Sequence, residues 1–216
     1  MKIDMHVHTC HSADSNLQLE DIIQTVKERG LDGIAVTDHN EIQGALRLKQ
    51  LAPFPVIVGE EIMTEDGEII GYFLDEIIDP GLPLLETITR IKKQGGLVAV
   101  PHPFDRLRTS ALKLNKLEII ADHLDLVEVF NSRIVFNQDN KLAQSFAEKA
   151  NLAKIAGSDA HTKQEIGAAW IEIEKFAGAS DFLTKAQYAT IIAKKSSIMV
   201  HVETKTKKIM RRLRRG

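Results

Sequence analysis

The sequence has little cysteine and no long apolar segment, and each scarcity excludes a class of protein. Cys10 is the one cysteine in 216 residues, which rules out an intrachain disulfide framework and suits a reducing compartment. No run approaches the roughly 20 apolar residues that a membrane-spanning helix needs, and the start, MKIDMHVH, lacks the apolar stretch of a signal peptide. No glycine-rich loop of the nucleotide-binding kinds is present either. We therefore expect a cytoplasmic protein with no membrane partner.

The bulk composition is that of an ordinary globular domain, with 44% hydrophobic and 27% charged residues. We expect a single domain over residues 1–204, followed by a basic tail over residues 205–216. The tail holds seven Lys or Arg residues and no acid, so the remainder carries 21 basic and 30 acidic residues. An acidic body suits a protein that holds several divalent cations. The tail is interpreted as a solvated terminus, with attraction to nucleic acid or anionic lipid as the alternative.

Strand-like and helix-like segments alternate along most of the chain. Six short apolar runs end in polar side chains of metal-binding type: DMHVH (4–8), GIAVTDH (33–39), PVIVGEE (55–61), LVAVPH (97–102), DLVEVFN (125–131) and AKIAGSDAH (153–161). Helical spacing predicts helices over 17–30, 40–52, 83–95, 110–122 and 139–150 and near 180–194. Asp66-Gly67 within residues 61–76 predicts a hairpin, and AAWIEIE and SSIMVHVE predict two later strands.

Buried parallel strands read as continuous apolar runs, and this alternation predicts a single, irregular α/β barrel with about seven strands. The main rival is a doubly wound open sheet, which gathers ligands at only one crevice. In a barrel, every carboxyl end opens onto the same face. Six strand ends with ligand-type side chains therefore favour the closed ring.

The first two strands carry the clearest ligand pattern. His6 and His8 are two residues apart, so both imidazoles point to the same face of the strand. Asp14 lies in the following loop, TCHSAD, from which its carboxylate can reach a second ion. His39 is a ligand candidate, whereas Asp38 points the opposite way and is expected to hydrogen-bond an imidazole N–H. His11 is closer than Asp14 but is less favoured, because it projects from an irregular loop.

The later strand ends add further candidates. One of the adjacent Glu60 and Glu61 faces the mouth, where a central glutamate could bridge two cations. Prolines on both sides of His102 stiffen its backbone and aim its side chain. The additional candidates from the last two strand ends are Asn131, Asp159 and His161. The Asp159 and His161 pair repeats the spacing of two, while Asn131 is either a weak carbonyl ligand or a turn cap.

The candidate ligands offer nitrogen and oxygen but no thiolate, which suits Zn²⁺, Mn²⁺ or Fe²⁺. They are more numerous than the three or four protein ligands of a mononuclear site, so two or three ions are expected. Ions roughly 3.5–4 Å apart can clamp the oxygens of a phosphoryl group. Arg106 and Arg133 follow two of the strand ends, and the guanidinium fork matches phosphate. Arg108 is a weaker candidate for the same task.

Taken together, these motifs resemble the PHP (polymerase and histidinol phosphatase) superfamily, and most of all its small stand-alone members. The resemblance covers at least residues 1–175 and rests on HVHTCHSAD, TDHN, PHPFD and GSDAH, with GEEI and EVFNSR between them. It implies a distorted (β/α)₇ barrel, similar to a TIM barrel, with a trinuclear site and Glu61 as the bridging glutamate. The implied ligand sets are His6, His8, Glu61 and Asp159; Glu61, His102 and Asn131; and Asp14, His39 and His161.

The preferred hypothesis is a phosphoesterase that hydrolyses a small phosphomonoester, such as a nucleotide or phosphorylated metabolite. In it a metal-bound hydroxide attacks phosphorus while Arg106 and Arg133 orient the phosphate. One alternative is a 5′→3′ exonuclease acting on short oligonucleotides, in which the tail would assist. Another is a non-catalytic binding module whose metals brace the barrel. The sequence leaves the substrate, the metal and the oligomeric state open.

Overall fold

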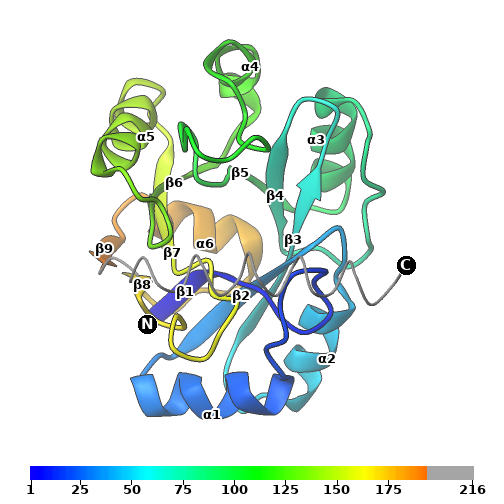
Figure 1. The fold of residues 1–216 in the computed structure, drawn as a ribbon, viewed down its shortest axis with the longest axis vertical. Helices are drawn as coiled ribbons and strands as arrows, with labels where there is room; N and C mark the ends of the chain where they lie inside the picture. The colour runs from blue at the N-terminus through cyan, green and yellow to red at the C-terminus, as the bar shows by residue number, and fades with distance from the viewer. Residues whose placement is uncertain (194–216) are drawn as a thin grey trace.

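Seven strands form a ring with helices outside it (Figure 1), in a computed structural model that describes residues 1–193. The ring strands are β1 (Lys2–Val7), β2 (Gly33–His39), β3 (Val56–Met63), β4 (Glu68–Tyr72), β5 (Leu97–Val100), β6 (Leu126–Asn131) and β7 (Ala153–Gly157). Neighbours in the ring follow chain order from β1 to β7. The ring closes where Val7 bridges Ala160 and the His8 N–H donates to the Ala160 carbonyl at 2.9 Å. The α/β barrel is therefore confirmed and the open sheet is wrong.

One strand of the ring runs against the other six. β4 pairs antiparallel with both β3 and β5, whereas the remaining neighbours within β1–β7 pair in parallel. The hairpin between β3 and β4 contains the predicted Asp66-Gly67 turn, and Gly67 has a φ of 140° that favours glycine. This reversed strand is what distorts the barrel.

The outer helices occupy the places that the apolar spacing predicts. They are α1 (Leu19–Arg29), α2 (Gln43–Leu51), α3 (Leu84–Lys93), α4 (Leu114–Ile120) with the 3₁₀ turn η1 (Ala121–His123), and α5 (Asn137–Lys149). In α1, Leu19, Ile22 and Val26 recur at helical spacing and are buried. Gly30 ends this helix in the left-handed conformation, with a φ of 66°.

Two clusters of buried apolar side chains divide the core between the outside and the inside of the ring. The first joins strand residues to helix residues such as Ile22 and Ile88, and so lies between the two layers. The second takes residues from every ring strand, so it fills the interior. Phe182 of α6 (Gly178–Ala186) belongs to the second cluster and packs on Phe73, just past the end of β4. Because β4 runs in reverse, α6 closes the end of the barrel opposite the carboxyl ends of the other strands.

The end of the described chain differs from the sequence prediction. The helix expected near 180–194 ends at Ala186, and β9 (Thr190–Ala193) follows it, paired antiparallel with β8 (Ala169–Glu172). Two isoleucines and a threonine in β9 favour a strand, which helical spacing alone did not show. The predicted strand 196–203, the domain boundary at 204 and the basic tail 205–216 lie outside the described residues. Within residues 1–193 no helix has both the length and the apolarity that crossing a bilayer requires.

Candidate metal centre

The first strand brings two imidazoles to a carboxylate from a neighbouring part of the ring. His6 Nε2 and His8 Nε2 lie 3.0 Å apart, and each lies 3.3 Å from Glu61 Oε2. Asp159 Oδ1 approaches the same point, at 3.4 Å from His8 Nε2 and 3.8 Å from His6 Nε2. All four side chains are completely buried. Their ligand atoms therefore surround one small volume at the carboxyl ends of β1, β3 and β7.

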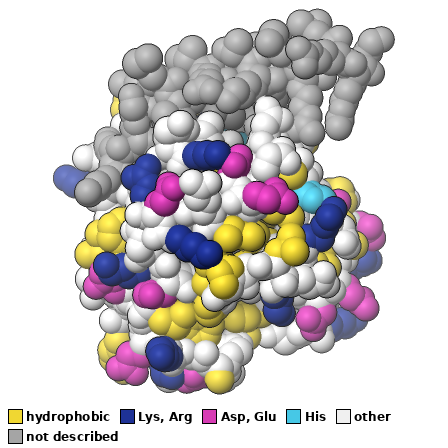
Figure 2. Space-filling model, turned by 90° about the horizontal axis from the view of Figure 1, so that it is seen from below, with side chains coloured by type: hydrophobic (Ala, Val, Ile, Leu, Met, Phe, Trp, Pro, Cys, Tyr) yellow, Lys and Arg dark blue, Asp and Glu magenta, His cyan; other side chains and the backbone are white. Residues whose placement is uncertain are grey.

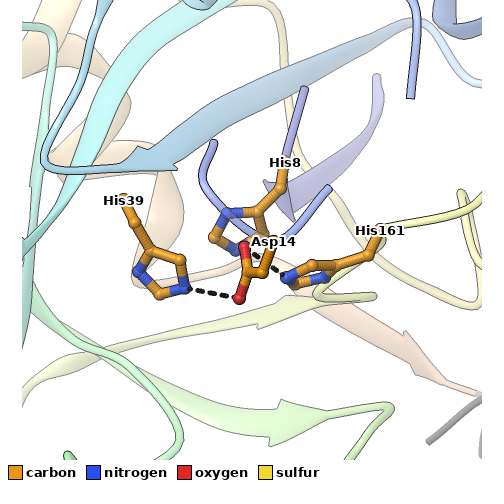
Figure 3. Close-up of side chains that lie close together, drawn as sticks. All are labelled: His8, Asp14, His39 and His161. Carbon is orange, nitrogen blue, oxygen red and sulfur yellow. Dashed lines mark ion pairs between the residues drawn. The ribbon is translucent and has the colours of Figure 1, made fainter. Parts of the chain in front are cut away.

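A second group lies beside the first and shares His8 with it (Figure 3). Asp14 sits between two imidazoles, with Oδ2 3.5 Å from His39 Nε2 and Oδ1 3.3 Å from His161 Nε2. The ligand atoms of His8, Asp14, His39 and His161 all lie within 4.8 Å of one another. Loop residue Asp14 thus reaches the strand ends as predicted, whereas His11 is in none of the candidate groups found among the described residues.

A third group contains a glutamate that sequence reasoning missed. Glu61 Oε1 lies 2.8 Å from His102 Nε2, and Glu61 Oε2 lies 3.3 Å from His39 Nδ1. Glu68 reaches the same two imidazoles, at 3.7 Å from His102 and 3.6 Å from His39. It is the first residue of β4, directly after the predicted hairpin turn. The Asp66-Gly67 turn could have pointed to Glu68. A strand that follows a hairpin turn runs in reverse, so its first residue lies at the end of the barrel where the parallel strands finish.

Of the adjacent glutamates, Glu61 faces the centre and Glu60 faces away. Glu60 Oε2 accepts the Ile78 N–H at 3.0 Å. Burial raises the pKa of Glu60 from 4.5 to about 8, so this carboxyl is mostly protonated at neutral pH. Burial would also raise the pKa of Glu61, but His39, His6 and His102 outweigh it and hold that pKa well below its usual range. The central carboxylate is therefore ionised and shared by imidazoles from three strand ends.

A layer of hydrogen bonds behind the ligands fixes their orientation. The unpredicted Glu128 accepts from the His102 N–H at 2.7 Å, and its other oxygen lies 3.0 Å from His6 Nδ1. A carboxylate behind an imidazole leaves the other ring nitrogen free to bind a metal. Asn131 donates from Nδ2 to Glu128 and to Asp159, at 3.0 and 3.2 Å. Its Oδ1 accepts the Arg133 N–H at 2.9 Å, so the amide group acts as a donor to the centre rather than an oxygen ligand.

Asp38 is buried, and its partners differ from the prediction. It accepts hydrogen bonds from both the N–H and the hydroxyl of Thr9. Among the described residues no imidazole N–H donates to Asp38, contrary to the prediction, because the loop after β1 places Thr9 over the end of β2. A Cβ at Gly44 would lie 2.2 Å from Asp38 Oδ2, so the start of α2 packs directly on this pair. Asp38 thus anchors the loop that carries Asp14.

The three arginines that follow strand ends have different partners. Arg106 forks onto Asp139, with Nη2 2.6 Å from Oδ1, and is 53% exposed. Arg133 is buried, and its Nη1 lies 2.6 Å from His161 Nδ1. Arg108 contacts Asp159 directly. Arg108, the weakest of the three sequence candidates, and Arg133 therefore both contact residues of the centre, while Arg106 is tied to α5.

The donor set fits divalent cations. Buried carboxylate oxygens normally have hydrogen-bond partners, yet Asp159 Oδ1 and Glu68 Oε2 have none within the described residues. Both atoms lie within 4 Å of an imidazole Nε2. Asp159 and His102 also have positive φ values of 54° and 29°, a conformation that costs energy for residues other than glycine. Strained residues and unpaired oxygens around one point are what a preformed ion site requires.

Comparison with known proteins relates the chain to one family model and to two archaeal proteins. A family model described as PHP-associated matches residues 137–187. The uncharacterized protein MJ1587 of Methanocaldococcus jannaschii is 41% identical over 145 residues, covering 61% of this chain and 82% of its own length. The uncharacterized protein MJ0417 of the same organism is 38% identical over 178 residues, covering 81% of this chain and 71% of its own length.

A solved structure with the same fold comes from a different group of organisms. It is a two-domain protein of Bacteroides vulgatus, described as containing a predicted PHP-like metal-dependent phosphoesterase. The TM-score is 0.72 at 17% sequence identity, and the match covers 90% of this chain. The chain spans 65% of that protein's length. At this identity the likeness concerns the fold.

Proposed function

The chain belongs to the PHP superfamily, and on that premise we propose that it is a metal-dependent phosphoesterase acting on a small phosphomonoester. The observation that carries the proposal is the position of Glu61, a fully buried carboxylate within 3.3 Å of imidazoles from β1, β2 and the segment after β5. A carboxylate has two oxygens, and one that lies among imidazoles from three parts of the ring is suited to bridging two cations. Two or three ions are proposed, with Zn²⁺, Mn²⁺ and Fe²⁺ all compatible with the donors.

Three sets of residues would hold the ions. The first set is His6, His8, Glu61 and Asp159, the second is Glu61, Glu68 and His102, and the third is Asp14, His39 and His161. Bound ions would activate a water molecule and neutralise charge on the phosphoryl oxygens. Asn131 is proposed as a support for Asp159 and Glu128 instead of a ligand, because its Nδ2 faces those carboxylates while its oxygen is turned to the Arg133 N–H.

The remaining residues of the site would bind and orient the phosphate. Arg108 and Arg133 place guanidinium groups beside Asp159 and His161, where they can fork onto phosphate oxygens. Arg106 could join them only by leaving Asp139. Figure 2 views the side of the molecule on which α1 and α2 lie, where acidic and basic side chains are scattered around an apolar area.

Hydrolysis of a generic aryl phosphate with added Mn²⁺ tests the proposal. His6→Ala and Asp159→Ala are each expected to lower kcat/KM by on the order of 100-fold or more, since even residues behind metal ligands cost 10–100-fold. His123→Ala, on the exposed surface of η1, is the matched control and keeps wild-type activity. Faster cleavage of oligonucleotides than of monoesters would favour the exonuclease. A metal-loaded protein silent on monoesters, diesters and oligonucleotides would instead be a binding module.

A further inference from the structure

Arg108 is a cation enclosed by carboxylates of the candidate centre. Its guanidinium contacts Asp159 Oδ2 and lies 3.4 Å from Asp105 Oδ2, and its side chain is 23% exposed. Burial alone would lower the pKa of Arg108, but the charges of Asp159, Glu61 and Glu68 outweigh this effect, so the pKa lies above its usual range. The structure therefore places the positive charge of Arg108 among the carboxylates of Asp105, Asp159, Glu61 and Glu68.

The backbone that carries Arg108 is anchored, while the guanidinium stands at the end of a long side chain. The Arg108 N–H donates to the Asp105 carbonyl at 3.1 Å, and the Asp105 N–H donates to the His102 carbonyl at 3.2 Å. Two residues further on, the Ser110 carbonyl accepts the Glu68 N–H at 2.8 Å. The loop is thus tied to His102 and to β4, so the guanidinium can change partners by side-chain rotation alone.

The two oxygens of Asp159 face different neighbours. Oδ1 has no hydrogen-bond partner within the described residues and points to the imidazoles of His6 and His8. Oδ2 accepts from Arg108 and from Asn131 Nδ2. An ion bound at Oδ1 would place two positive charges across one carboxyl group from the guanidinium. Asn131 is neutral and can keep Oδ2 in place after Arg108 has left.

The other two arginines each pair with a carboxylate outside the ligand sets. Arg106 pairs with Asp139, which belongs to α5 and to none of the ligand sets. Arg133 lies 3.6 Å from Glu165, whose other oxygen accepts the N–H groups of His161 and Thr162. Arg133 also touches a proposed ligand, with Nη1 2.6 Å from His161 Nδ1, but of the three arginines Arg108 alone contacts a carboxylate of the ligand sets.

We propose that Arg108 is the internal counter-ion of the metal-free centre, gives up Asp159 when the ions bind, and then binds the substrate phosphate. This inference rests on the proposed function, since it assumes that ions and a phosphate share the pocket. Arg108 would thus have two roles: it competes with the metal ions for Asp159, and it binds the substrate. A permanent support for Asp159 would behave in the opposite way, because its removal would weaken metal binding.

Calorimetric titration of Mn²⁺ into metal-stripped protein separates the two roles. Arg108→Gln is expected to bind Mn²⁺ about tenfold more tightly, because it removes a nearby positive charge. Arg108→Lys keeps that charge and should stay near the wild-type affinity, and Arg106→Gln is the matched control at a guanidinium outside the centre. An unchanged or weaker affinity in Arg108→Gln would overturn the proposal.

The second half of the proposal concerns phosphate. Inorganic phosphate titrated into the Mn²⁺-loaded proteins should bind Arg108→Gln at least tenfold more weakly than wild type. Equal phosphate affinity in the two proteins would refute the transfer of Arg108 to the substrate. If wild-type protein binds no Mn²⁺ at all, the proposed function itself fails, and this outcome differs from a failure confined to Arg108.

A measurement on the wild-type chain covers the case in which Arg108→Gln does not fold. The ¹⁵N-labelled guanidinium of Arg108 should show hindered rotation in the metal-free protein, where it is paired with Asp159. Zn²⁺ should release this hindrance, and inorganic phosphate added afterwards should restore it. A signal that Zn²⁺ leaves unchanged would contradict the proposal.

Discussion

At the residue scale, three of the five imidazoles of the centre are held from behind, each by a different kind of group. His6 Nδ1 lies 3.0 Å from the Glu128 carboxylate, and His8 Nδ1 lies 3.3 Å from the Ser12 hydroxyl. His161 Nδ1 lies 2.8 Å from the Asp159 carbonyl. In all three rings Nε2 is the atom that points into the centre. Orientation of this kind depends on close packing, so a small change behind a ring should alter metal binding.

Gly157 provides a test of that packing. A Cβ at this position would lie 2.2 Å from the His6 Cβ and 2.9 Å from the His6 nitrogen, so Gly157→Ala must displace β1. We expect Mn²⁺ affinity to fall at least tenfold and the free energy of unfolding to fall by about 1–3 kcal/mol. Gly30→Ala is the control, since its φ is 66° and nothing lies within 4 Å of the new Cβ.

The control should lose about 1 kcal/mol of stability and none of its Mn²⁺ affinity. Urea unfolding and calorimetry measure the two quantities separately. Wild-type Mn²⁺ affinity in Gly157→Ala would show that the position of His6 does not depend on this contact.

The sequence could predict which residues reach the centre better than it could predict what each one does there. His6, His8, His39 and His102 were recognisable because each ends or follows an apolar run. Asn131 was recognisable too, but the direction of its amide group depends on the hydrogen bond from the Arg133 N–H. The sequence pattern does not show that bond. The role of a residue that depends on hydrogen bonds between distant segments can be assigned only from the three-dimensional structure.

At the element scale, the reversed strand β4 determines the composition of the centre. A parallel strand presents its last residues at the mouth, whereas an antiparallel strand presents its first. Glu68 opens β4 and pairs with Met63 at the far end of β3, so it lies level with the ligands of the parallel strands. The hairpin could be predicted from Asp66-Gly67, yet its consequence for the site follows only when the direction of β4 is considered. The same rule explains why Phe73, at the other end, meets α6.

Replacing Glu68 tests the contribution of this strand. Glu68→Gln removes a charged oxygen near His39 and His102 and should reduce the number of tightly bound Mn²⁺ ions by one. Glu65→Gln changes an exposed residue of the same hairpin and should leave the metal content unchanged. Metal analysis of the dialysed proteins gives the ratio of ions to chain. Equal ratios in wild type and Glu68→Gln would remove Glu68 from the ligand sets.

At the scale of the whole molecule, closure of the barrel gathers more buried charge than an apolar interior tolerates. The metal-free protein compensates part of it by protonating imidazoles. Burial would lower the pKa of His8, but Asp159 and Glu61 outweigh it and raise that pKa to about 9. Burial and the neighbouring His8 lower the pKa of His161 to about 4. At neutral pH, His8 is therefore protonated while His161 is already neutral.

Metal binding should consequently release protons and strengthen as the pH rises. An imidazole must be neutral to bind a metal, so below its pKa of about 9 His8 loses one proton for each Mn²⁺ it receives. Through this proton alone, Mn²⁺ affinity should rise about tenfold from pH 7 to pH 8. Calorimetry in buffers with different ionisation enthalpies counts the protons directly. A Mn²⁺ affinity that does not change between pH 7 and 9 would contradict a protonated His8. The closed barrel would then hold its buried carboxylates without the positive charge of that imidazole.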